Sequence, residues 1–286
     1  MQKRNVVNSP RLLELKNTRR KIFIRKVVII VLGFLLILGS LVFISRIKQL
    51  NITSVETTGN KVIDSEAITE FINTEIKGKY LWLFPKTNIL LYPKNKLQVN
   101  LGEKFKRLTD INLSMGKDKK LIVSVNEREP EYTWCGVVPP QNDNKEICYF
   151  LDKEGYIFDE APYFSGEVYF KFYGTTGKEN PAGVYLAKGY FDKLITFKNT
   201  LTNINLKPVI LYIEDGEDLK IYLSRSGANI LGPEIRVKKD ADFQKMAENL
   251  KAALDTEPLL SKFKKEYSSL EYIDLRFGNK VYYKFK

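Results

Sequence analysis

The hydrophobic pattern of the chain is dominated by one unbroken apolar run near the N-terminus. Residues 27–44 read VVIIVLGFLLILGSLVFI, a stretch of 18 residues without a charged side chain. A helix of that length rises about 27 Å, which is close to the hydrocarbon thickness of a bilayer. Because the run is apolar on every side, it is not typical of a soluble helix with one buried face. The pattern therefore predicts a transmembrane helix over residues 27–45.

The pattern after this run changes to strand-length and helix-length segments. Residues 50–128 carry alternating apolar positions at both ends and two helix-period stretches between them. Asp64 can cap the first of these helices, and a loop around residues 78–85 offers Trp82 and Phe84 for packing. The order β-α-α-β-β predicts a small α+β module with two helices against a three-stranded sheet. The predicted strands are 52–58, 111–115 and 121–126, and the second predicted helix is 94–108.

Residues 129–286 have a different character, with many Tyr and Phe residues and frequent Gly, Pro and Asn-Asp turns. Short apolar runs between these turns are typical of strands, and two longer amphipathic stretches are typical of helices. We therefore expect an antiparallel-rich β domain with packed helices. The predicted strands are 132–135, 147–151, 156–158, 168–173, 208–214, 219–223, 228–231, 272–277 and 281–285, and the predicted helices are 189–201 and 241–254.

The charge of the chain is concentrated at its start. The 286 residues include 46 Lys+Arg and 34 Asp+Glu, a net charge of +12. Residues 1–26 hold nine basic residues and one acidic residue, so this basic arm carries +8 and the rest of the chain +4. Basic residues flank a membrane helix on its cytoplasmic side, which predicts a cytoplasmic N-terminus and an extracytoplasmic remainder. A cleaved signal peptide is the alternative, but the small pair Gly39-Ser40 lies inside the apolar run.

The composition also limits the chemistry that the chain can perform. The chain has no histidine, which excludes Ser-His-Asp and Cys-His nucleophiles as well as mixed Cys/His zinc sites. An acidic turn at residues 214–218 can hold calcium, but Asp-Gly between two strands is also a common hairpin turn. The diffuse charge outside the arm does not favour nucleic acid. We therefore predict no catalytic residue, no cofactor, no metal and no nucleic-acid partner.

The two cysteines flank a turn-rich insert between two predicted strands. Cys135 and Cys148 lie in the part of the chain that the predicted topology places in an oxidising compartment. A disulfide across this insert is the favoured interpretation, and two unpaired thiols are the alternative.

Several weak motifs occur in one order along the chain. VETTGN at residues 55–60 precedes the two-helix module, and a strand then runs into Glu127, Arg128 and Pro130. Asp152, Gly155 and Phe158 form a D-x-x-G-x-x-F element, and residues 273–276 read I-D-L-R. Together with the basic arm and the single apolar run, this order resembles the FtsQ/DivIB cell-division proteins over nearly the whole chain. From the residues alone, Glu127, Arg128, Pro130, Asp152 and Gly155 are expected to be structural.

The resemblance implies a POTRA domain at 50–128 and an FtsQ/DivIB-type β domain at 129–286. It implies a non-enzymatic scaffold of the division septum, anchored in the inner membrane, that binds FtsB/DivIC-like and FtsL-like coiled-coil proteins. Through them it acts indirectly on the septal peptidoglycan synthase complex. A partner strand is added to an edge of the β domain in that family, which places the contacts at Arg276, Phe277, Val281, Tyr283 and Phe285. The alternatives are a POTRA-bearing secretion or chaperone component and an envelope hydrolase that uses a carboxylate pair.

Overall fold

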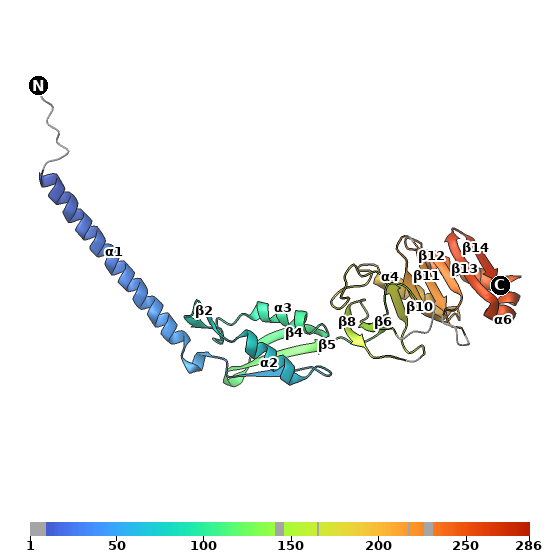
Figure 1. Cartoon of the computed structure of the whole chain (residues 1–286), viewed down its shortest axis with the longest axis horizontal. Coiled ribbons are helices and arrows are strands. Elements are labelled where there is room, and N and C mark those ends of the chain that lie inside the picture. The colour runs from blue at the N-terminus through green and yellow to red at the C-terminus, as the bar shows by residue number, and fades with distance from the viewer. Residues whose placement is uncertain (1–9, 141–145, 165, 217, 226–230) are drawn as a thin grey trace, which may run out of the picture. The chain divides into compact units, whose positions relative to one another are not determined.

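The computed structural model describes residues 10–140, 146–164, 166–216, 218–225 and 231–286. It is a mixed α/β chain with one long N-terminal helix and a large mixed sheet (Figure 1). The chain divides into two compact units. The first unit comprises residues 1–101 and 110–125, and the second comprises residues 102–109 and 126–286.

The N-terminal helix α1 (Pro10–Ser45) is 36 residues long and includes the whole predicted span. Proline is favoured at a first helical position because its missing N–H would have no partner there. The predicted boundary between a basic arm and a span at residue 27 is not a structural boundary, since one helix runs through it. The segment Glu14–Ser45 is long and apolar enough to cross a membrane.

The globular part of the first unit has helices α2 and α3 beside a three-stranded sheet in the order β1-β5-β4. Strand β1 runs parallel to β5, with Val55 opposite Leu121. The Asp64 carboxylate accepts a hydrogen bond from Glu66 N and caps α2, as the sequence predicts. A two-stranded hairpin, β2–β3, replaces the predicted loop at 78–85. The elements are β1 (Ser54–Thr58), α2 (Ser65–Glu75), β2 (Lys79–Tyr80), β3 (Phe84–Pro85), α3 (Lys94–Lys104), β4 (Leu108–Met115) and β5 (Lys120–Glu127).

The second unit is built on a nine-stranded sheet in the order β14-β13-β12-β11-β10-β9-β6-β7-β8. The pairs β12–β13, β9–β10 and β6–β9 are parallel and the other neighbours are antiparallel, so the sheet is mixed. The strands are β6 (Tyr132–Trp134), β7 (Cys148–Leu151), β8 (Ile157–Ala161), β9 (Lys171–Gly174), β10 (Pro208–Ile213), β11 (Asp218–Leu223), β12 (Glu234–Lys238), β13 (Leu270–Phe277) and β14 (Lys280–Phe285).

Helices pack on one face of this sheet and form the main core. Apolar side chains of α4 (Phe191–Asn203) and α5 (Phe243–Leu254) are buried against inward-facing residues of the central strands. Phe197 stacks on Phe243 between the two helices, with ring centroids 4.6 Å apart. A third helix, α6 (Leu259–Glu266), follows α5 and was not predicted from the sequence. Short 3₁₀ helices occur at η2 (Lys48–Leu50), η3 (Lys117–Lys119) and η4 (Tyr267–Ser269).

One predicted strand lies mostly outside the described residues, and one strand of the structure was not predicted. The strand predicted at 228–231 falls mostly on residues 226–230, which lie outside the described residues. The strand that pairs with both β11 and β13 is β12, residues 234–238, which the sequence analysis did not identify. Only two apolar residues, Ile235 and Val237, alternate in β12 with the charged residues Glu234 and Arg236. This pattern is too short to predict a strand.

Candidate partner-binding edge

Strand β14 is the last strand at one end of the nine-stranded sheet. Its only neighbour among the strands that the structure describes is β13. The N–H of Lys286 donates to Ser269 O at 2.8 Å, on the side of β13. Because backbone groups alternate in direction along a strand, the N–H groups of residues 281, 283 and 285 point to the open edge. This edge can accept a further strand through main-chain hydrogen bonds.

The side chains of β14 alternate between the core face and the outer face. Val281, Tyr283 and Phe285 are partly buried and pack against the core, and α5 contacts their strand. Tyr283 and Phe285 touch edge to face, with centroids 5.9 Å apart. These three residues are among the predicted partner contacts, and the structure places them on the inner face. A partner strand added at the edge would meet their backbone and the margins of their rings.

The outer face at this edge carries two exposed aromatic rings. Phe277, at the end of β13, and Tyr282, on β14, are 56% and 48% exposed, and their rings meet edge to face at 5.3 Å. Phe277 is a predicted contact that the structure leaves accessible. Tyr282 was missed by the sequence analysis, although its position between Val281 and Tyr283 assigns it to the opposite face. Lys284 lies on the same face and forms a 2.7 Å ion pair with Glu271.

Arg276 is held within the fold by two carboxylates. Its Nε and Nη2 donate to the carboxylate of Asp274 at 2.9 and 2.6 Å, and its Nη1 pairs with Asp218 on β11. Residues two apart on a strand share a face, which explains why the I-D-x-R pattern places these two side chains together. Arg276 therefore links β13 to β11 across β12, and its side chain is 26% exposed. The predicted contact residue is thus also a residue that orders the sheet beside the edge.

The titration of Asp274 reflects this pairing. Burial alone would raise the pKa of the Asp274 carboxyl, but hydrogen bonds from Arg276 outweigh burial and hold the pKa below its usual value. The same hydrogen bonds to Asp274 raise the pKa of Arg276. A second ion pair lies on this face between Arg236 and Glu234, and the Arg236 guanidinium stacks on the ring of Tyr272, 4.1 Å from its centroid.

Two of the predicted motif segments meet elsewhere in the second unit. Arg128 forms a buried ion pair with Asp152 and stacks on the ring of Tyr156, 4.0 Å from the centroid. Asp152 Oδ1 also accepts hydrogen bonds from the N–H groups of Glu154 and Tyr156, both at 2.9 Å, which shapes the β7–β8 turn. Gly155 in this turn has a φ of +79°, and a Cβ there would lie 2.7 Å from the Phe191 ring.

The remaining motif residues belong to the segment between β5 and β6. Glu127 is the last residue of β5, and Pro130 follows three residues later, before β6 begins at Tyr132. A proline cannot donate to a strand ladder, so its position agrees with the end of β5. All five motif residues therefore occupy turns, strand ends or buried pairs.

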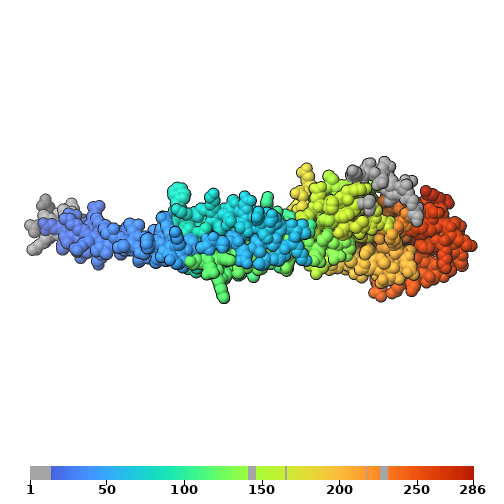
Figure 2. Space-filling model, turned by 90° about the horizontal axis from the view of Figure 1, so that it is seen from below, coloured from blue at the N-terminus to red at the C-terminus, as the bar shows by residue number. Residues whose placement is uncertain are grey.

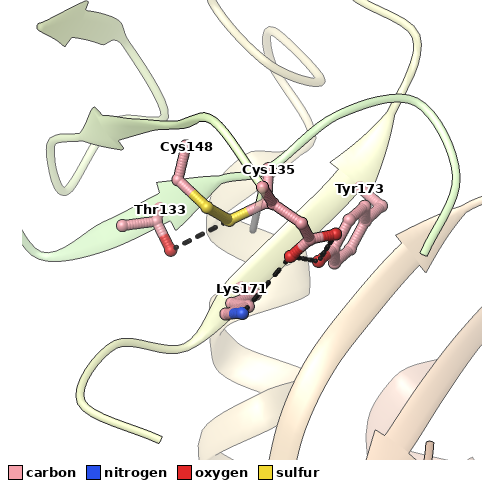
Figure 3. The surroundings of a disulfide bond; sticks show 6 residues. Thr133, Cys135, Cys148, Lys171 and Tyr173 are labelled. Carbon is pink, nitrogen blue, oxygen red and sulfur yellow. Dashed lines mark hydrogen bonds and ion pairs between the residues drawn. A yellow bond between two sulfur atoms is a disulfide. The ribbon is translucent and has the colours of Figure 1, made fainter. Parts of the chain in front are cut away.

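Cys135 and Cys148 are joined by a disulfide of 2.05 Å in the structure (Figure 3). The antiparallel β6–β7 register pairs Trp134 with Tyr149. Cys135, which follows Trp134, therefore lies directly opposite Cys148, which precedes Tyr149. Glu146 lies beside the disulfide. Its carboxylate accepts a hydrogen bond from Tyr173 OH and forms an ion pair with Lys171. Burial, followed by the hydrogen bond to Glu146, raises the pKa of Tyr173. The two sulfurs and a Glu146 oxygen lie within 4.8 Å of one another, but the sulfurs are bonded to each other.

Comparison of the chain with protein-family models and with curated proteins gave no match. Over the described residues, the fold defines a mixed α/β chain with one helix long and apolar enough to span a membrane and a sheet that ends at the edge strand β14.

Proposed function

We propose that this protein is a non-enzymatic scaffold of the bacterial division septum, of the FtsQ/DivIB type. It is anchored in the inner membrane by α1, with a cytoplasmic N-terminus and extracytoplasmic globular units. It binds FtsB/DivIC-like and FtsL-like coiled-coil partners at β14, and through them acts on the septal peptidoglycan synthase complex.

One observation carries the binding proposal. Strand β14 ends the nine-stranded sheet and presents the N–H groups of Val281, Tyr283 and Phe285 on its unpaired side. Main-chain hydrogen bonds to an added strand supply affinity, and side chains at alternate positions supply specificity. The exposed pair Phe277 and Tyr282 provides an apolar contact on the outer face next to this edge.

A pair of substitutions at one position tests the proposal. Tyr283→Pro removes an N–H that points to the open edge, whereas Tyr283→Ala keeps that N–H and removes the ring. Loss of a main-chain hydrogen bond and the clash of the proline ring with an incoming strand should weaken partner binding at least about tenfold in Tyr283→Pro. The measurement is co-purification and affinity of full-length variants with the FtsB/DivIC-like and FtsL-like pair.

The comparison between the two variants decides the mechanism. Stronger loss in Tyr283→Pro than in Tyr283→Ala supports strand addition. Equal binding by wild type and Tyr283→Pro, with unchanged circular dichroism, would refute β14 as the binding edge.

Localisation tests the cellular role independently. A fluorescent fusion of the scaffold should collect at midcell during constriction. A uniform signal around the envelope would instead favour the alternative, a secretion or chaperone component that captures extended polypeptides.

A further inference from the structure

The turn of the β2–β3 hairpin presents two large apolar side chains to solvent. Leu81 is 85% exposed and Trp82 is 89% exposed. The sequence offered Trp82 for packing near its loop, but the structure leaves its side chain exposed. Leu90, a few residues beyond the hairpin, is 80% exposed as well. Apolar groups of this size are usually withdrawn from water, so their common exposure requires an explanation.

The backbone of this turn is unfavourable for the residues that occupy it. Leu81 and Trp82 have φ angles of +47° and +59°, and Leu83 N donates to Tyr80 O at 2.9 Å. Positive φ angles at two consecutive residues are typical of type I′ turns, which favour Asn and Gly at these positions. Side chains with a Cβ are strained in this left-handed region. Leu81 and Trp82 therefore lower the stability of the hairpin relative to residues that favour this backbone conformation.

The hairpin lies at the end of the membrane-spanning helix. Arg46, the first residue after α1, donates from Nε to Leu83 O at 3.3 Å and from Nη2 to Trp82 O at 3.5 Å. In Figure 2 the cyan surface around residue 80 adjoins the blue surface of the helix end. The exposed turn is thus placed where the apolar run of α1 stops at Ile44.

This placement is fixed by hydrogen bonds to the last helical carbonyls. The Asn88 side-chain amide is buried and donates to Ser45 O at 3.0 Å. Asn51 donates to Ser45 O and Ile47 O at 3.1 and 2.8 Å. Backbone bonds from Ile52 N to Thr87 O and from Ile89 N to Leu50 O pair the helix exit with the segment after the hairpin. The hairpin and Leu90 therefore keep their position relative to the end of α1.

The charge around the turn is positive. Residues 76–93 contain Lys77, Lys79 and Lys86 and no carboxylate. Lys86 lies over the Tyr80 ring, 5.9 Å from its centroid, and Lys79 pairs with Pro85 at the base of the hairpin. An apolar tip flanked by lysines complements a membrane surface, since tryptophan is favoured at the headgroup level of both leaflets and lysine can lay its apolar stem on the membrane while its charge stays in water.

We propose that the β2–β3 hairpin docks on the lipid bilayer at the C-terminal end of α1, with Leu81 and Trp82 inserted at the headgroup level. The contact with lipid surrounds the Leu81 and Trp82 side chains with apolar groups, which the protein itself leaves exposed. The same contact orients the first unit on the membrane. This inference rests on the proposed anchoring of the chain by α1.

Tryptophan fluorescence tests the docking directly, because the chain has only two tryptophans, Trp82 and Trp134. The full-length Trp134→Phe variant is reconstituted into vesicles of phosphatidylglycerol and phosphatidylcholine, with or without bromine atoms on the acyl chains. We expect Trp82 emission to be shifted to the blue and quenched by the brominated lipids. If Trp134→Phe does not fold, the difference between wild type and Trp82→Phe supplies the same signal.

A matched control places a tryptophan elsewhere on the first unit. Val99 on α3 is 58% exposed, and Val99→Trp in a background of Trp82→Phe and Trp134→Phe should give water-exposed emission that brominated lipids do not quench. Carbonate extraction reports insertion of α1 separately. Extraction of the wild type into the soluble fraction would refute the proposed anchoring. Two results would overturn the docking while the protein stays in the vesicles. In the first, brominated lipids quench Trp82 no more than they quench the Val99→Trp control. In the second, Trp82 becomes shielded from water only after coiled-coil partners are added.

Discussion

Neutralising Asp152 should destabilise the second unit strongly, because its carboxylate is the partner of a buried guanidinium. The side chains of Arg128 and Asp152 are 17% and 8% exposed, so water compensates little for a missing partner. Arg128 Nε is also buried without a hydrogen-bond partner among the described residues. Removing one member of a buried ion pair costs about 3–5 kcal/mol, since the other charge is left unpaired.

Two substitutions separate the charge of Asp152 from its role in the turn. Asp152→Asn keeps an oxygen for the N–H groups of Glu154 and Tyr156, while the charge and the oxygen that accepts from Arg128 are lost. We expect it to lower the free energy of unfolding by about 3 kcal/mol, near the lower limit because the Tyr156 ring still faces the guanidinium. Asp152→Ala also removes two hydrogen bonds at about 1 kcal/mol each, for a total of about 5 kcal/mol.

Urea unfolding of a fragment of residues 46–286 measures these changes. In a Trp82→Phe background the signal comes from Trp134, which is buried in the second unit on β6. Glu271→Gln, which breaks the more exposed pair with Lys284, is the control and should lower the free energy of unfolding much less than Asp152→Asn, because water screens this pair.

A double-mutant cycle checks the cause. Arg128→Met combined with Asp152→Asn should be less unstable than Asp152→Asn alone, because no charge is then left unpaired. The buried ion pair is refuted as the cause if the losses in free energy of unfolding of the two single variants simply add in the double variant. It is also refuted if the free energy of unfolding of Asp152→Asn lies within about 0.5 kcal/mol of wild type.

Three further predictions concern other parts of the chain. Replacing Cys135 and Cys148 by Ser should lower the free energy of unfolding by about 3 kcal/mol, measured by urea unfolding without reductant; an unchanged midpoint would contradict a bridge in the folded protein. Because the folded pKa of Asp274 is lowered, its stabilisation is complete above its unfolded pKa of about 3.9 and is lost as the pH falls through the folded pKa. Wild type should therefore lose stability more steeply below about pH 4 than Asp274→Asn, and parallel pH profiles would contradict this. The double variant Leu81→Asn and Trp82→Gly relieves the strained turn and should raise the thermal midpoint in detergent, a gain of about 1 kcal/mol in the free energy of unfolding; a lower midpoint would contradict the strain.

The predicted elements were closest to the structure where local pattern and packing agree. The Asp64 cap, helix α5 and the paired strands β10 and β11 combine a turn or cap with a clear apolar periodicity. Elements in which few residues carry the pattern were not predicted. Helix α6 is short, and β12 alternates only two apolar residues with charged ones. The loop prediction at 78–85 failed because Leu81 and Trp82 occupy a turn type that their residue types do not favour.

At the candidate edge, sequence reasoning identified the strands but not the orientation of their side chains. The pattern of residues 281–285 predicts a strand, and alternation assigns Tyr282 to the face opposite Tyr283. Which of these faces lies toward the core and α5 depends on how a helix from another part of the chain packs on the sheet. Arg276 shows the same limit, since its second partner, Asp218, lies 58 residues away in the chain.

The sequence by itself determined an apolar helix with a basic flank, the absence of histidine chemistry and the positions of most strands. These properties depend on composition and on neighbours in the chain, which hydropathy and periodicity report directly. Only the tertiary structure decided that β14 is an edge strand, that Arg128 meets Asp152, and that Trp82 lies beside the end of α1. Strand order and long-range pairing depend on contacts between segments far apart in the chain, and no local pattern specifies those contacts.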